Sequence, residues 1–417
     1  MSTIVSSGHK QIVQSGQEVH GVILRGGTQI VSSGGGAIRT VISASGHQIL
    51  YDSLAKGTVV SAGGVQSAAG GFIDGATILG GTEIISDGDA KNVHIADGGV
   101  QRVENGGIVD ATTIISGRQI ISGGAEVYHT VVGRGGVEEV LGGLVGSSVV
   151  HAGGTMIVGR GQVYAATIMG GATVEFRGGR FSGTVASGAT ELVLAGINEN
   201  LHINKGVRFV VSHGSAVGTV VSSGALETVE SGGYENGADI QSGASLVVSG
   251  GTVGAVIENG GMETVLSGGY ALAAIVDSGG LVRMMSGSKA RKITLSGGEG
   301  VVMSGADVRY AQFGADSTLR VYGGQVSTTL LEFGAGDGLD LASFGYSKAE
   351  TFTFSYAPAV TRAKVTVTDG AMTASIILFG QFTAAGFHIA ADHAGGSVLT
   401  YSPPSSASTP AIATGHH

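Results

Sequence analysis

The sequence contains no cysteine, no tryptophan and only 4 prolines among its 417 residues. Without cysteine, the chain has no disulfides, no thiol chemistry and no cysteine-bound zinc. A proline lacks the N–H group that an interior strand residue donates to its neighbour. The prolines are Pro358, Pro403, Pro404 and Pro410. The long stretch before Pro358 is therefore open to continuous strand pairing.

Basic residues and long apolar runs are also scarce. The 22 Lys and Arg are outnumbered by 31 Asp and Glu, which gives a formal net charge of -9. Nucleic-acid binding depends on cations that neutralise phosphates, so no nucleic-acid partner is expected. No run of about 18 apolar residues occurs, so no transmembrane helix is expected. Residues 1–10 lack a basic segment followed by an apolar run, so the sequence predicts no conventional signal peptide.

Glycine, in contrast, is abundant, with 77 residues, and it recurs in turns. A turn glycine returns roughly every 18 residues, a period typical of repeat arrays. The pattern is clearest in residues 222–304, where the chain reads VESGG at 229–233, VVSGG at 247–251 and VLSGG at 265–269. One copy alone could not bury its apolar face, so the copies must stack in order to fold.

Three short apolar segments separated by turns can be read in each repeat. Gln29-Ile30-Val31 is an example of the first segment and Thr40-Val41 of the third. The glycines recur too often for helices of ten or more residues. We therefore predict an all-β fold in which residues 1–330 form a β-solenoid. The prediction is a right-handed parallel β-helix with about 18 residues and three short strands per coil.

One polar position repeats along the first coils, two residues after a glycine turn. Its members are Gln11, Gln29, Gln48, Gln66, Glu83, Gln101, Gln119 and Glu138. Amide side chains stacked at strand spacing can hydrogen-bond to one another along the stack. We expect this row to be a solvated, stabilising face, and the alternative is that it touches a ligand.

The texture of the sequence changes after about residue 330. Alternating segments at 351–356 and 364–368 precede Asp369-Gly370, a dipeptide typical of a tight hairpin turn. We predict that residues 331–401 form a small C-terminal β domain that caps the solenoid, since a terminal coil would otherwise expose open strand edges. Residues 402–417, rich in Pro, Ser and Ala, are predicted to be a disordered tail.

Catalytic motifs are absent from the sequence, which has no His-Glu-x-x-His, P-loop, dinucleotide fingerprint or Gly-x-Ser-x-Gly elbow. We therefore predict a protein without enzymatic activity. The rival hypothesis is a polysaccharide lyase or hydrolase, which would need carboxylates and cations converging on one face. The nearest candidates are Glu138-Glu139 with Arg134, and Arg283 near Lys289, Arg291 and Lys292. Neighbouring Glu138 and Glu139 should point to opposite faces of a strand.

One segment is similar to a fragment of the glycine- and aspartate-rich calcium repeats of secreted proteins. It reads Gly336-Asp337-Gly338-Leu339-Asp340 and occurs once, so Asp337 and Asp340 are weak candidates for a calcium site. No other cofactor is expected.

Serine occupies many of the turns, where its hydroxyl can bond to nearby backbone groups. Serines repeated on exposed corners would also be accessible to a modifying enzyme. The Val-x-Ser-Gly-Gly turns, and the segment Gly26-Gly-Thr-Gln-Ile-Val-Ser-Ser-Gly-Gly35, resemble the AIDA-type repeats of bacterial self-associating autotransporter adhesins. The resemblance covers about residues 4 to 330.

This resemblance implies a secreted or surface-displayed bacterial passenger that mediates adhesion, auto-aggregation or biofilm formation. Its partners would be further copies of itself, or glycans or proteins on host or neighbouring cells. The resemblance also implies O-linked heptose, added to turn serines by a heptosyltransferase. The acceptor positions that it implies are Ser231, Ser249 and Ser267, followed by Ser33, Ser122, Ser278 and Ser296.

Two features of that family are not evident in the sequence, namely a signal peptide and a C-terminal membrane barrel of long alternating strands. The export route therefore stays open. A third hypothesis for the function is a structural spacer that presents another domain.

Overall fold

The computed structural model describes residues 3–193, 196–346 and 351–404. Every regular element of the described residues is a β-strand, except for two short 3-10 helices, Pro358–Val360 and Ala384–Gly386. The chain divides into two compact units, residues 1–252 and 253–417, and each is described by itself. The predicted all-β class is confirmed.

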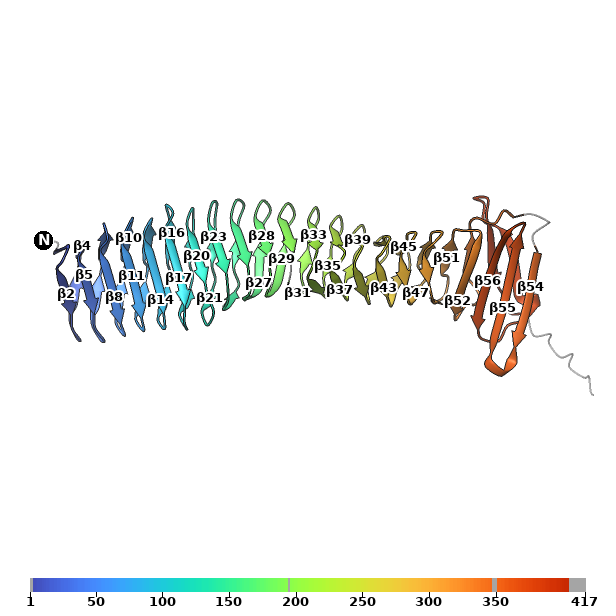
Figure 1. Cartoon of the computed structure of the whole chain (residues 1–417), viewed down its shortest axis with the longest axis horizontal. Helices are drawn as coiled ribbons and strands as arrows, with labels where there is room; N and C mark the ends of the chain where they lie inside the picture. Colours follow the sequence, from blue (N-terminus) through green and yellow to red (C-terminus); the bar gives the residue numbers. More distant parts are fainter. Residues whose placement is uncertain (1–2, 194–195, 347–350, 405–417) are drawn as a thin grey trace, which may run out of the picture. The chain divides into compact units, whose positions relative to one another are not determined.

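Most coils of the first unit contribute three short parallel strands. One coil consists of β5 (Thr28–Val31), β6 (Gly36–Ile38) and β7 (Val41–Ser43). In the next coil, Gln48 of β8 (His47–Tyr51) pairs with Gln29, Ala55 pairs with Ala37, and Val60 pairs with Ile42. The strands β2, β5, β8 and β11 follow one another in the stack (Figure 1). The predicted β-solenoid, with three strands in a repeat of about 18 residues, is confirmed.

The core of the first unit consists of rows of aliphatic side chains. Alternate residues of a strand point to opposite faces, so one row per strand faces inward. One such row lies two residues after the Gln and Glu position of the first strand, and it is fully buried. Its members are Val13, Val31, Leu50, Ala68, Ile85, Val103, Ile121 and Val140. Such thin layers need few aromatic residues, which agrees with their scarcity in the sequence.

The row of Gln and Glu side chains also faces inward, and the prediction of a solvated face is therefore wrong. Gln29, Gln48, Gln66, Glu83, Gln101, Gln119 and Glu138 all have an exposed fraction of 0%. The amides bond along the stack: Gln29 Nε2 donates to Gln11 Oε1 at 2.7 Å, Gln48 Nε2 to Gln29 Oε1 at 2.6 Å, and Gln66 Nε2 to Gln48 Oε1 at 2.8 Å. Buried polar groups must be hydrogen-bonded, and this row of Gln and Glu side chains, called the amide spine below, gives each buried amide Nε2 an acceptor.

The second unit contains further coils and then antiparallel strands. The last coil contains β52 (Gln325–Leu331) and β53 (Gly338–Leu341), which are both paired on their outer sides: β52 with a parallel strand and β53 with an antiparallel one. A meander of β54 (Thr351–Ala357), β55 (Arg362–Asp369) and β56 (Met372–Phe379) joins β52 through β56. β58 (Ser397–Tyr401) covers β53, and β57 (Phe387–Ala391) pairs with β58. These antiparallel strands therefore cover the edges of the last coil.

Aromatic residues fill the space between these antiparallel strands. The centroid of the Phe387 ring lies 4.8 Å from that of Tyr401, and 5.7 Å from those of Phe382 and Phe354. Asp369 ends β55 and Gly370 begins the two-residue turn to β56, as the hairpin character of this dipeptide predicts. Parallel stacking continues to β53, beyond residue 330. Of the predicted tail at 402–417, residues 405–417 lie outside the described residues.

Candidate functional site: turn serines and a glycine recess

Four of the candidate acceptor serines occupy the same position in a four-residue turn. In the turn that holds Ser267, the Gly269 N–H donates to the Leu266 carbonyl at 2.9 Å. Gly268 follows the serine with a φ of 84°. A positive φ at the third position only, supplied by glycine, is the signature of a type II turn. The same pattern of bond and glycine surrounds Ser33, Ser231 and Ser278.

The seven candidate serines differ in exposure and in local structure. Five of them are exposed, namely Ser33, Ser231, Ser267, Ser278 and Ser296, whereas Ser122 and Ser249 are half-buried. Ser296 is the last residue of strand β47 (Ile293–Ser296), not a turn residue. Ser122 immediately precedes the turn formed by Gly123 and Gly124. The exposed turn hydroxyls of Ser33, Ser231, Ser267 and Ser278 are therefore the most accessible to an enzyme.

A glycine of the following coil makes room for some of these hydroxyls. Gly287 lies in the coil after Ser267, and a Cβ added to it would lie 2.5 Å from Ser267 Oγ. Gly297 stands in the same relation to Ser278, with 3.1 Å between the added Cβ and the serine Cβ. The glycines at these corners are thus required by positive φ and also by the serine beside them.

Substitution of Gly287 by alanine tests this contact. We expect a loss of about 1 to 2 kcal/mol from the left-handed backbone alone, and a further loss because the new Cβ displaces the Ser267 hydroxyl. Equilibrium unfolding of Gly287→Ala, Ser267→Ala and the double variant measures the coupling between the two positions. Losses that simply add would show that the two residues do not touch.

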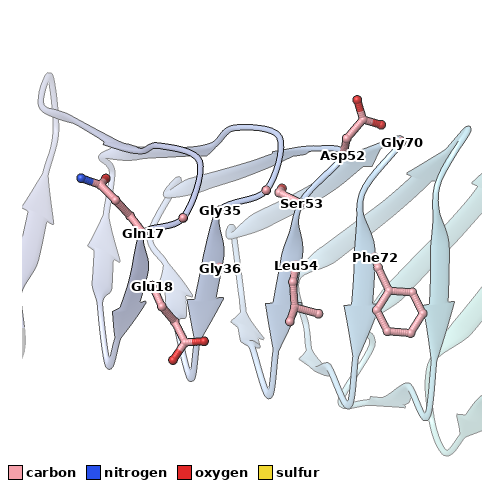
Figure 2. A pocket seen from close by; sticks show the side chains of 11 residues that line it. Gln17, Glu18, Gly35, Gly36, Asp52, Ser53, Leu54, Gly70 and Phe72 are labelled. Carbon is pink, nitrogen blue, oxygen red and sulfur yellow. The ribbon is translucent and has the colours of Figure 1, made fainter.

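A recess of about 590 Å³ opens on the surface of the first unit where three glycines follow one another. Glu18, Gly36, Leu54 and Phe72 are strand neighbours in successive coils. Figure 2 shows that Glu18, Leu54 and Phe72 project to one side, while Gly36 leaves a gap between them. The recess therefore exists because one coil lacks a side chain where its neighbours have large ones.

The lining of this recess combines apolar and acidic side chains. Leu54 and Phe72 are apolar, whereas Glu18 and Asp52 bring carboxylates. Lys91 Nζ lies 5.1 Å from the centroid of the Phe72 ring. Such a lining suits a small ligand that has both apolar and polar groups. Sequence reasoning did not identify this recess, although the run Gly34-Gly35-Gly36 was a visible signal.

The two calcium candidates lie in the second unit, and both are engaged in intramolecular bonds. Asp337 Oδ1 accepts the Ser317 N–H at 3.1 Å, and its Oδ2 accepts the Gly334 N–H at 2.8 Å. Burial raises the pKa of the Asp337 carboxyl. Asp340 Oδ2 accepts from Arg320 Nε at 2.6 Å. No group of three or more His, Asp or Glu comes together among the described residues. Calcium binding stays a prediction, which isothermal titration with calcium tests.

The candidate catalytic residues do not bring carboxylates and cations together on one face. Glu138 is buried in the interior, whereas Glu139 faces outward and forms an ion pair with Arg118. Opposite orientations are what alternation in a strand predicts. Arg283 is exposed on β45 (Leu281–Met284), where its strand neighbours are Thr264 and Val301 rather than a carboxylate. Lys289 and Arg291 are also exposed.

Within the described part of the chain, no helix has the length and apolar character needed to cross a bilayer.

No protein-family model matches this sequence, and no curated protein matches it. Among solved structures, the crystal structure of a TibC-catalyzed, hyper-glycosylated fragment of TibA is similar to this chain. The two share 23% sequence identity with a TM-score of 0.39, and the alignment covers 76% of this chain and 92% of the fragment.

Proposed function

We propose that this chain is a bacterial adhesin-like β-helix that acts outside the cell without catalysing a reaction. Its proposed role is adhesion, auto-aggregation or biofilm formation, through contacts with further copies of itself or with glycans or proteins on other cells. Many shallow contacts repeated along a stack of coils would reinforce one another, because each contact raises the effective concentration of the next.

The observation that carries this proposal is the repeated exposure of turn serines. Ser33, Ser231, Ser267 and Ser278 present exposed hydroxyls at the same position of a type II turn. The Val-x-Ser-Gly-Gly turns that hold Ser231 and Ser267 are the ones that resemble AIDA-type repeats. We propose that these serines accept O-linked heptose from a dedicated heptosyltransferase. The half-buried Ser249 and Ser122, and the strand residue Ser296, are proposed as secondary acceptors.

Intact mass spectrometry of the chain expressed with its own host's glycosyltransferases tests the modification. We expect mass increments of one heptose each, and peptide mapping should place them first on the four exposed turn serines. Alanine at Ser231 and Ser267 should remove two increments. Ser288→Ala provides a matched control, because Ser288 is 1% exposed and donates to the Met285 carbonyl at 2.6 Å. An unmodified mass, or an increment lost in Ser288→Ala, would contradict the proposal.

Adhesion is tested separately, with cells that display the chain on their surface. The control is cells that display only the unrelated carrier protein used to anchor the chain. We expect the cells with the chain to sediment faster and to attach more strongly than these controls. Equal behaviour of the two cell types would refute the adhesive role and would favour a structural spacer. Release of reducing ends or unsaturated products from anionic polysaccharides would instead support the rival enzymatic function.

A further inference from the structure

The amide spine has one direction. In each of its pairs, the side-chain Nε2 of one coil donates to the side-chain oxygen of the preceding coil. This holds for Gln29, Gln48 and Gln66, and it holds again for Gln101, which donates to Glu83 Oε2 at 2.7 Å, and for Gln119, which donates to Gln101 Oε1 at 2.7 Å. Gln29, Gln48 and Gln101 thus accept from the coil that follows and donate to the coil that precedes.

The row has no amide donor between Gln66 and Glu83. The pair Gln119 and Glu138 lacks one too, but there Gln119 Oε1 accepts from the Thr130 hydroxyl at 3.1 Å. Gln66 and Glu83 are strand neighbours and both are fully buried. Gln66 Oε1 has no hydrogen-bond donor, and neither has Glu83 Oε1 a partner. Two acceptors therefore meet at this link, and neither has a donor. A buried acceptor without a donor is costly.

We propose that Glu83 carries a proton in the folded chain and donates it to Gln66 Oε1, so that a neutral carboxylic acid completes the amide spine. A protonated carboxyl has one donor and retains acceptor capacity, as an amide side chain does. The O–H of Glu83 would take the place of the missing Nε2–H. Its other oxygen would continue to accept from Gln101.

The surroundings of Glu83 leave the proton no other destination. In the preceding coils, Thr40 and Thr58 add a hydroxyl beside the spine and accept from Gln48 and Gln66 at 3.2 Å. The equivalent positions are Ala76 in the coil of Gln66 and Val93 in the coil of Glu83, and neither residue has a hydroxyl. Gln66 Oε1 is therefore the acceptor that the row provides.

No charged side chain faces Glu83 from the described strands packed around it. Its neighbours in the row, Gln66 on β11 (Val65–Ala69) and Gln101 on β17 (Val100–Glu104), are neutral amides. The inward-facing residues of the other strands in these coils are Ile73, Ile78, Ala90 and Ile95. Burial raises the pKa of the Glu83 carboxyl to about 7, although the bond from Gln101 opposes the shift.

Folding should therefore take up a proton at Glu83, since an unfolded glutamate is ionised above about pH 4.5. Other interior acids also contribute to the pH dependence, among them Glu138 and Glu235. Glu138 is buried against the Ser148 hydroxyl, 3.0 Å from its Oε1. Glu235 is hydrogen-bonded to Glu227 and Thr219 inside the same unit, and burial raises its pKa. A test of Glu83 must therefore compare variants rather than rely on the wild-type trend.

Glu83→Gln and Glu83→Leu separate the roles of shape, bonding and proton. Glutamine has the same shape and supplies the missing donor without a proton from solvent. Leucine, in contrast, leaves Gln66 and Gln101 without their partner. Equilibrium unfolding of the full chain in urea, followed from about pH 5 to about pH 8, measures all three proteins, and one proton taken up on folding changes the unfolding constant about tenfold per pH unit.

We expect the unfolding constant of the wild type to rise more steeply with pH than that of Glu83→Gln, by up to about tenfold per pH unit. The two should be equally stable at about pH 5, and Glu83→Leu should be less stable throughout. Identical pH slopes for wild type and Glu83→Gln would overturn the proposal. Carbon-13 NMR of the wild-type glutamate carboxyls tests it directly: the resonance missing from Glu83→Gln should be that of a protonated acid at about pH 6, and an ionised carboxylate there would refute the inference.

Discussion

Replacement of Phe176 by alanine is expected to lower the free energy of unfolding of the first unit by about 3 to 5 kcal/mol. Phe176 is the last residue of β28 (Thr173–Phe176), and its side chain is completely buried. Its ring lies 6.1 Å from that of Phe181, and a Cβ added to Gly196 would lie 2.5 Å from the Phe176 ring. Gly196 has no side chain that could extend into the cavity.

Urea unfolding of the Phe176→Ala variant, read by circular dichroism, measures this loss. Ile12→Ala is a matched control, because it also removes an apolar side chain from a strand but one with an exposed fraction of 58%. Its effect should stay within about 0.5 kcal/mol. A loss below about 1 kcal/mol for Phe176→Ala would mean that the coils collapse around the cavity and that the core is more plastic than its packing indicates.

Raising the pH is expected to lower the free energy of unfolding of the first unit. Burial raises the pKa of Glu83 and of Glu138 to about 7 from the usual 4.5. Both acids bind their protons more tightly in the folded chain, so their contribution is complete below about pH 4.5 and is lost as the pH rises towards 7. At about 1.4 kcal/mol per pKa unit, the loss is on the order of 3 kcal/mol for each residue.

Thermal or urea unfolding between about pH 4.5 and pH 8 measures this trend. The double variant Glu83→Gln, Glu138→Gln should have a flatter profile than the wild type and should be the more stable protein at about pH 8. The residual slope of the variant belongs to the remaining groups, among them Glu235. A wild-type stability that rises through this range would show that the interior glutamates are ionised in the folded chain.

The repeat of the sequence was sufficient to predict the coil, but not which face of each strand is buried. In the segment Gln29-Ile30-Val31, the structure buries the glutamine and leaves Ile30 half-exposed. Alternate side chains of a strand point to opposite faces, but the alternation does not say which face is buried. Because glutamine is polar, its row was predicted to face the solvent. Gln29 is buried because it finds Gln11 on the coil before it and Gln48 on the coil after it. Only the stacked row satisfies it, and a single repeat does not contain that information.

The candidate site was predicted in part for a similar reason. Glycine and serine preferences locate turns, and they correctly placed Ser231 and Ser267 at corners. They did not distinguish these residues from the half-buried Ser249, whose exposure depends on the neighbouring coils. The recess beside Gly36 depends on Leu54 and Phe72 of later coils. The exposure of the serines and the recess both depend on side chains of several coils, so the sequence of one coil alone does not predict them.

The direction of the amide spine bears on how the first unit loses its structure. In an array whose repeats touch only their nearest neighbours, end coils can fray one at a time. The uninterrupted links from Gln11 to Gln66 act differently, because hydrogen bonds that point the same way polarise one another. Breaking one link weakens the bonds on either side of it. These four coils should therefore melt as a block, which gives a repeat protein a cooperative segment longer than its own repeat.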